Sequence, residues 1–252
     1  MAEQWVAAGV VATPVELGVS EVGRLRFRGG LALSAPAPFG GISGLDVLED
    51  GRLIAVTDSA NWLMADLVLD EDEALIGLSN ARMAFMRDET GALFPNKAAG
   101  DAEALVQMPD GRFAVAFEQT QTIRIYDLNR DGPFGAASPG PALAGASRLW
   151  PNAGLEALAA DADGALIVGA EGGGGPTPLW RAPLGASEPA PQIGRYVTAS
   201  GFSLTGLDRA PDGAFFALER LFAPILGARA RITRIASLGG ERIVGEELAV
   251  LA

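Results

Sequence analysis

One arrangement of apolar and polar positions occurs four times along the chain. In each copy a strand-like run ends at Asp-Gly, and a second run that is apolar at almost every position follows the glycine. Asp-Gly between apolar runs is typical of a two-residue type I′ turn, because both central residues of that turn need a positive φ. The pattern therefore predicts four β-hairpins, with turns at Asp50-Gly51, Asp110-Gly111, Asp163-Gly164 and Asp212-Gly213.

The second run of each hairpin indicates how the hairpins pack. RLIAVT, RFAVAF, ALIVGA and AFFALE are apolar on both faces, as strands are when other layers cover both of their sides. Corresponding leucines of the first runs (Leu45, Leu105, Leu158 and Leu207) are 60, 53 and 49 residues apart. Repeats of about 40 to 50 residues with about four strands each are typical of a β-propeller. We therefore expect a single all-β domain, a β-propeller over residues 1–252, in preference to a β-sandwich.

A two-residue turn also determines which positions face each other across a hairpin. In two of the four hairpins the facing residues near the strand ends are both glutamates, and like charges at such a position repel. We therefore expect a bound cation or a retained proton to offset the repulsion. The facing pairs are, in chain order, Ser43 with Asp58, Glu103 with Glu118, Glu156 with Glu171, and Thr205 with Arg220.

These pairs occupy equivalent places in the repeats, so a propeller would gather them at one mouth of its central channel. Ca²⁺ is the natural candidate for a cation there, because it takes about 6–8 oxygen ligands and needs neither His nor Cys. Ser43, Thr205 and Asn152 could add neutral oxygens. The alternative is that the acids bind backbone N–H groups and Arg220 and only hold the blades together. The candidate metal ligands are Asp58, Asp101, Glu103, Glu118, Glu156 and Glu171.

Composition narrows the chemistry further. The 252 residues contain no His and no Cys, which excludes a Ser-His-Asp triad, a His-ligated zinc site and any thiol nucleophile. A net charge of −12 argues against nucleic acid and anionic membranes as partners. No apolar run approaches the roughly 20 residues that a membrane span needs. The first residues also lack the features of a signal peptide, which fits a cytoplasmic protein or a trimmed, mature chain.

Five segments resemble the phytase-like propeller family, which is described as having esterase-like activity of phytase. The resemblance implies a propeller of five or six blades, a hydrolase activity, and an exported protein in the periplasm or outside the cell. Members of that family continue into a further acidic module, N-x-E-G followed by S-D-D-N, whereas this sequence stops at Ala252, so we expect a ring that either lacks the last blade or closes as a smaller propeller. The segments are RFRGGLAL, GGISGLDVLEDGRLIAVTD, GDAEALVQMPDGRFAVAFE, GLEALAADADGALIVGAEG and LTGLDRAPDGAFFALER.

The functional hypothesis is a metal-assisted hydrolase of phosphate or carboxylic esters that takes a small anionic or ester substrate. Arg220 would bind the anion, and so would Lys97, the only lysine, which lies in a long loop. One alternative is a non-catalytic propeller that binds a ligand or a protein, since no G-x-S-x-G nucleophile motif occurs. A calcium-dependent, lactonase-like propeller is another. The candidates for the general base are Glu103, Glu118, Glu156 and Glu171.

Overall fold

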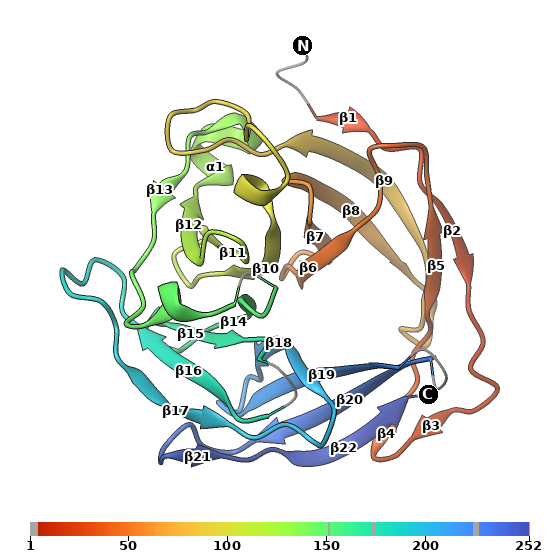
Figure 1. Ribbon diagram of the computed structural model, residues 1–252. Coiled ribbons are helices and arrows are strands. Elements are labelled where there is room, and N and C mark those ends of the chain that lie inside the picture. Colours follow the sequence, from red (N-terminus) through yellow and green to blue (C-terminus); the bar gives the residue numbers. More distant parts are fainter. Residues whose placement is uncertain (1–4, 151, 173–174, 224–226, 252) are drawn as a thin grey trace.

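The computed structural model describes residues 5–150, 152–172, 175–223 and 227–251. These residues form an all-β structure in which four sheets stand around a central axis, as the blades of a propeller do (Figure 1). The two strands of each predicted hairpin pair antiparallel. Helical segments among the described residues are short, and none is long and apolar enough to cross a membrane.

Within each blade, the strands are named in order from the central axis to the rim. The first blade contains β6 (Ile42–Val47), β7 (Arg52–Thr57), β8 (Asn61–Leu69), β9 (Leu75–Phe85) and β1 (Val6–Ala7). The second contains β10 (Ala102–Gln107), β11 (Phe113–Phe117), β12 (Thr122–Tyr126) and β13 (Ser138–Pro139). The third contains β14 (Leu155–Ala160), β15 (Leu166–Ala170), β16 (Thr177–Ala182), β17 (Gln192–Tyr196) and β21 (Arg242–Ile243). The fourth contains β18 (Ser203–Arg209), β19 (Phe215–Ala223), β20 (Gly227–Ile235) and β22 (Glu246–Leu251).

Two short ribbons and a few helical turns complete the described structure. The ribbons pair β2 (Val11–Pro14) with β5 (Leu31–Ser34), and β3 (Glu21–Val22) with β4 (Leu25–Arg26). The helical segments are α1 (Leu128–Asp131) and the 3₁₀ turns η1 (Ala98–Gly100), η2 (Gly132–Phe134) and η3 (Ala146–Arg148).

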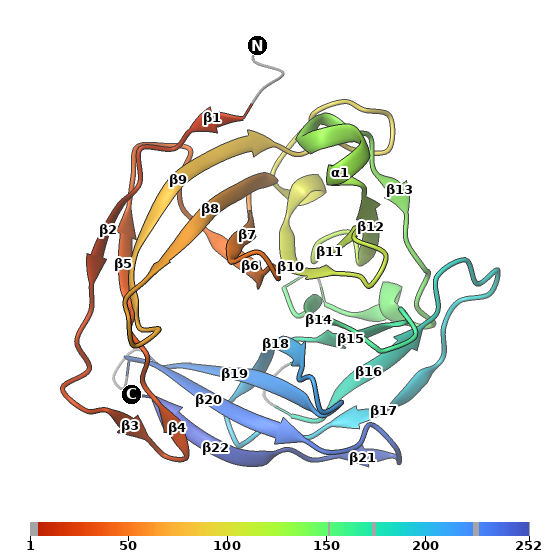
Figure 2. The same ribbon diagram turned by 180° about the vertical axis from the view of Figure 1, so that it is seen from behind.

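The ring contains four blades among the described residues, where the sequence leads us to expect five or six. Strands β6, β10, β14 and β18 contact one another in that order around the axis. The N-terminal ribbons occupy the rim between the fourth and the first blade (Figures 1 and 2). There β3 contacts β22, and β2 and β5 contact β9. The N-terminal segment thus forms a rim rather than a further blade.

Three of the four apolar second strands are covered on both sides, as predicted. Every residue of β11 and β15 is buried, and so is β7 after its first residue. Strand β19 is the exception, because its face toward the third blade is buried while Leu218 on the other face is 42% exposed. The prediction is wrong for that face, which borders the central cavity and is left partly exposed.

The four hairpin turns are not of the predicted type. In the second hairpin, Met108 N–H donates to Arg112 O at 2.8 Å, so the loop has three residues instead of two. Only the glycine of each turn has a positive φ, with values of 81, 84, 81 and 88°. The aspartate stays right-handed because its carboxylate accepts a local backbone N–H, as Asp110 does from Arg112 at 3.1 Å. This type I turn with a left-handed glycine moves the pairing by one residue.

A β-bulge near the start of each first strand moves the pairing by a second residue. Beyond the bulge, Glu118 N–H donates to Asp101 O at 2.9 Å, and Glu171 N–H donates to Gly154 O at 2.8 Å. The four predicted facing pairs are therefore wrong. A bulged residue has no partner in the ladder, and bulges commonly redirect a side chain. The bulged residues are, in chain order, Ser43, Glu103, Glu156 and Thr205.

The inner strands of the first two blades approach each other closely at Gly44. A Cβ on Gly44 would lie 2.7 Å from the Leu105 backbone nitrogen. We expect Gly44→Ala to lower the free energy of unfolding by about 1–3 kcal/mol, the usual cost of overpacking. Urea unfolding would measure it, with Gly77→Ala as a control, because the atom nearest to a Cβ there is 3.6 Å away. Equal effects of the two substitutions would contradict the close approach.

Candidate functional site

Five carboxylates from the second and third blades gather at one mouth of the ring. Oxygens of Asp101, Glu103 and Glu118 lie within 4.8 Å of one another, and so do oxygens of Glu118, Glu156 and Glu171. Glu118 belongs to both groups of three. We refer to these five residues as the acidic mouth.

The ends of neighbouring strands bring these side chains together. Glu103 and Glu156 are the bulged residues of β10 and β14, whereas Glu118 and Glu171 directly follow β11 and β15. Asp101 directly precedes β10 and is 4% exposed. Because β10 contacts both β14 and the hairpin partner β11, the two groups meet at Glu118.

Two cationic side chains flank the acidic mouth. Lys97 Nζ lies 2.6 Å from Asp101 Oδ1 and 3.3 Å from Asp58 Oδ2. On the other side, Arg220 Nη2 lies 3.5 Å from Glu171 Oε1. Asp58, from the first blade, thus reaches the site through Lys97 and lies outside both groups of three that the described residues form.

Burial and mutual repulsion hold protons on part of the acidic mouth. Burial, followed by the charges of Asp101 and Glu118, raises the pKa of Glu103 to about 8. Burial and the charge of Glu171 raise the pKa of Glu156 to about 8 as well. The pKa of Glu118 is raised mainly by burial, although the N–H of Gly154, 3.3 Å from its Oε1, opposes this. The surroundings therefore stabilise fewer negative charges than the site has carboxyl groups.

The loop that carries Lys97 is held to the second blade by Arg124. The guanidinium lies 5.1 Å from the ring centre of Phe94 in the loop and 4.3 Å from that of Phe117 in β11. Its Nε donates to Glu89 Oε1, also in the loop, at 2.7 Å. Loop length alone indicated a functional segment, but no sequence pattern identified Arg124, because its partners come from the loop and from β11, both outside its own strand.

The predicted neutral ligands each make a hydrogen bond within the protein. Ser43 Oγ donates to Ala102 O and joins the first two blades. Thr205 Oγ1 donates to Leu218 O at 3.4 Å, and Asn152 Oδ1 accepts from Gln119 Nε2 at 2.9 Å. Sequence reasoning placed all three around the mouth, but their oxygens are engaged within the protein.

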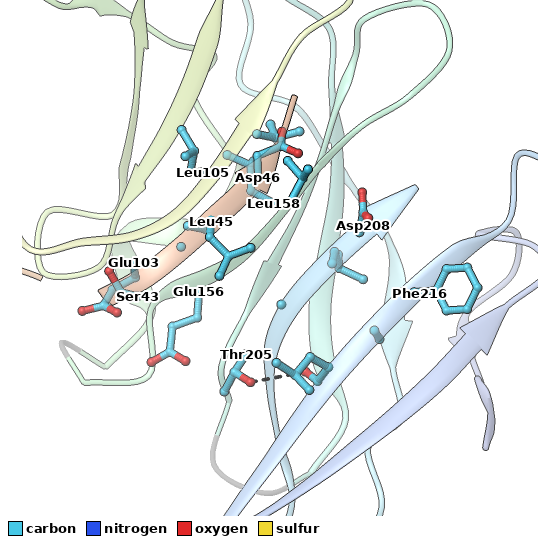
Figure 3. A pocket seen from close by; sticks show the side chains of 18 of the residues that line it. Ser43, Leu45, Asp46, Glu103, Leu105, Glu156, Leu158, Thr205, Asp208 and Phe216 are labelled. Atoms are coloured by element: carbon cyan, nitrogen blue, oxygen red, sulfur yellow. Dashed lines mark hydrogen bonds between the residues drawn. The ribbon is translucent and has the colours of Figure 1, made fainter. Parts of the chain in front are cut away.

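A central cavity of about 520 Å³ adjoins the acidic mouth. Figure 3 shows Glu103 and Glu156 at one end and Asp46 and Asp208 at the other, with leucines of the inner strands between them. Leu45, in this apolar wall, is 58% exposed. The volume lies within the range of small-molecule sites, about 300–1,000 Å³. The cavity thus offers an ionisable end and an apolar body to a ligand.

Comparison with known protein families shows which family the chain belongs to. The family model named Phytase-like and described as "Esterase-like activity of phytase" matches residues 37–248. The chain belongs to the phytase-like family. The match covers the inner hairpins of all four blades of this phytase-like chain, including every residue of the acidic mouth. A search of curated proteins finds no significant match.

Solved structures similar to this phytase-like chain show low identity. A streptogramin B lyase is 11% identical with a TM-score of 0.42, and the alignment covers 95% of this chain and 73% of the lyase. A putative 6-phosphogluconolactonase from Bacteroides fragilis is 15% identical with a TM-score of 0.43, covering 98% and 66%. A protein of unknown function from Bacteroides caccae is 12% identical with a TM-score of 0.47, covering 99% and 87%. These values carry no information about chemistry.

Proposed function

We propose that this protein is a metal-assisted hydrolase of phosphate or carboxylic esters, and that it acts at the acidic mouth. The observation that carries the proposal is that two groups of three carboxylates share Glu118. Five carboxylates there face two flanking cations, Lys97 and Arg220, among the described residues. Their oxygens suit a hard cation such as Ca²⁺, which accepts several carboxylates in flexible geometry. A bound cation would offset the repulsion and polarise the oxygens of an ester.

The residues of the mouth divide into roles under this proposal. Asp101 and Glu118 are the most buried of the five, and they serve as ligands. Glu103 and Glu156 line the cavity, and their pKa of about 8 describes the metal-free site, so a bound cation would have to lower it before either group accepts a proton near neutral pH. One of these two is the general base. Arg220 binds an anionic oxygen of the substrate from the rim.

The cavity favours one kind of ester. Its wall between the two ionisable ends consists mainly of leucine and valine side chains, including Leu45, Val47 and Leu158. An apolar group of an ester can be buried there, whereas a highly charged molecule would find few partners along the wall. We therefore propose esters that carry an apolar group as the preferred substrates.

A chelation experiment tests the proposal. The release of p-nitrophenol from p-nitrophenyl butyrate and from p-nitrophenyl phosphate would be measured before and after EGTA treatment, and again after added Ca²⁺. We expect EGTA to lower the rate at least about tenfold and Ca²⁺ to restore it, since the cation supplies the missing positive charge. The exposed Glu188→Gln is a control that leaves the acidic mouth unchanged.

Two outcomes would change the conclusion. Hydrolysis that persists both in EGTA and in Glu103→Gln would overturn the metal-assisted mechanism. A rise in Tm with Ca²⁺ but no turnover of either ester would instead favour a non-catalytic, ligand-binding propeller. That alternative agrees with the hydroxyl of Ser43 being engaged by Ala102 O and not free as a nucleophile.

A further inference from the structure

A second cavity, of about 420 Å³, lies at the rim of the first blade, away from the ring axis. Strand β1 and the Pro36–Pro38 turn line it together with β9, the segment that follows β9, and η2. Most of its lining is apolar, and the two large side chains Phe85 and Leu93 are 48% and 38% exposed. Its lining includes Met83, Phe85, Arg87 and Leu93.

One cationic side chain lines this apolar cavity among the described residues. Arg87 is partly buried, and its Nε is fully buried without a hydrogen-bond partner. The structure shows no ion pair between Arg87 and a described carboxylate, in contrast to Arg124, which pairs with Glu89. The two Nη atoms of Arg87 are accessible and have no partner among the described residues, so they can donate to an acceptor from outside the protein, which the buried Nε cannot reach.

The nearest carboxylates along the chain are engaged elsewhere. Asp88 Oδ1 accepts the backbone N–H groups of Thr90 at 2.8 Å and Ala92 at 3.0 Å. Glu89 Oε1 accepts from Arg124 Nε at 2.7 Å. Neither forms an ion pair with Arg87, although both are close to it in sequence. In a protein with a net charge of −12, this cation lines an apolar cavity and has no carboxylate partner among the described residues.

We infer that the rim cavity binds a small organic carboxylate with an apolar body. Arg87 would take the carboxylate through its planar, forked donors, which match a carboxylate in geometry. The apolar body would cover Phe85, Leu93 and Met83, as apolar walls with a few convergent polar groups do in small-molecule sites. The rim cavity shares no residue with the central cavity, so the inference does not depend on the proposed hydrolase activity.

Binding of three probes with the same eight-carbon tail tests the inference. Octanoate, 1-octanol and octylammonium would each be titrated into the full chain by isothermal calorimetry, in EGTA at pH 7. We expect saturable binding of one octanoate per chain, and binding at least about tenfold weaker for the alcohol and the ammonium ion. The acidic mouth would favour the ammonium ion, so the order of the probes also separates the two sites.

Two variants test the role of the cation. Arg87→Met should weaken octanoate at least about tenfold and leave 1-octanol unchanged, whereas the exposed Arg148→Met, with the same change of charge, should change neither. Leu93→Asp places a carboxylate on the residue that pairs with Arg87 in a β-bridge, and it should abolish octanoate binding while the protein stays folded. Circular dichroism checks the fold of each variant. The inference would be overturned if octanoate showed no saturable binding, or if Arg87→Met and Leu93→Asp both left its binding unchanged.

Discussion

Replacing Glu118 with Gln is expected to lower the affinity for Ca²⁺ about 100-fold and to reduce ester hydrolysis by about 10²- to 10⁴-fold. The substitution keeps the size of the side chain and removes its charge. Glu118 is the carboxylate that both groups of three share, and it is only 7% exposed, so the loss affects the whole acidic mouth. Calorimetric titration with Ca²⁺ and kcat/KM for p-nitrophenyl butyrate would measure the two effects.

The exposed Glu188→Gln serves again as the matched control, with the same chemical change away from the mouth. An unchanged affinity for Ca²⁺ together with a lower Tm would favour a purely structural role for the acids. In that case Glu118→Gln would lower Tm, because the carboxylate accepts the Gly154 N–H from the neighbouring blade, but Ca²⁺ affinity would not change. The two readouts therefore separate metal binding from the joining of blades.

The metal-free protein is expected to lose stability as pH rises from about 5 to about 8.5. The folded protein retains protons on Glu103 and Glu156 up to a pKa of about 8, whereas the unfolded chain releases them near the ordinary value of 4.5. Between these values the folded state binds more protons, so the free energy of unfolding falls as pH rises. We expect Tm to fall by roughly 5 °C or more over this range, measured by calorimetry in EGTA.

The double variant Glu103→Gln/Glu156→Gln should flatten this dependence, because it removes the two groups with the largest increases in pKa. The surface aspartates do not obscure the effect. Asp50, Asp110 and Asp212 have pKa values lowered from 3.8 by arginine partners, so their contributions change only at pH values below this range. Saturating Ca²⁺ should raise Tm most at the high end of the range. A Tm that stays constant or rises in the metal-free protein would contradict the expected protonation.

The gathering of the acids could be predicted although their pairing could not. The turn shifts each hairpin by one residue, and the bulge shifts it by one more. A shift of one residue alone would turn every side chain to the opposite face, but a shift of two restores the original face. Glu118 is therefore opposite Asp101 instead of Glu103, and all three still point to the same mouth.

Other features depend on contacts that no local pattern reveals. The hairpins and their apolar strands follow from periodicity and turn residues, which act within about fifteen residues. The turn type was decided by a side chain, since the carboxylate of Asp110 stabilises the right-handed conformation. The contacts of Arg124 with Phe94 and Phe117, and the position of Arg87 away from every described carboxylate partner, arise from segments distant in sequence. The rim made by residues 11–34 likewise depends on contacts with β9 and β22, which lie later in the chain.

At the bulges, the side chain can vary while the strand pairing of each blade stays the same. The same irregularity occurs in all four blades, although the residue at its centre is Ser, Glu, Glu or Thr. That residue has no partner in the ladder, so strand pairing within the blade sets no preference for its side chain, although Ser43 uses its hydroxyl to join the first two blades. A single replacement at one of these positions can change the charge at the entrance without repacking a blade. Descendants of such a chain could thus acquire new specificities while keeping the same architecture.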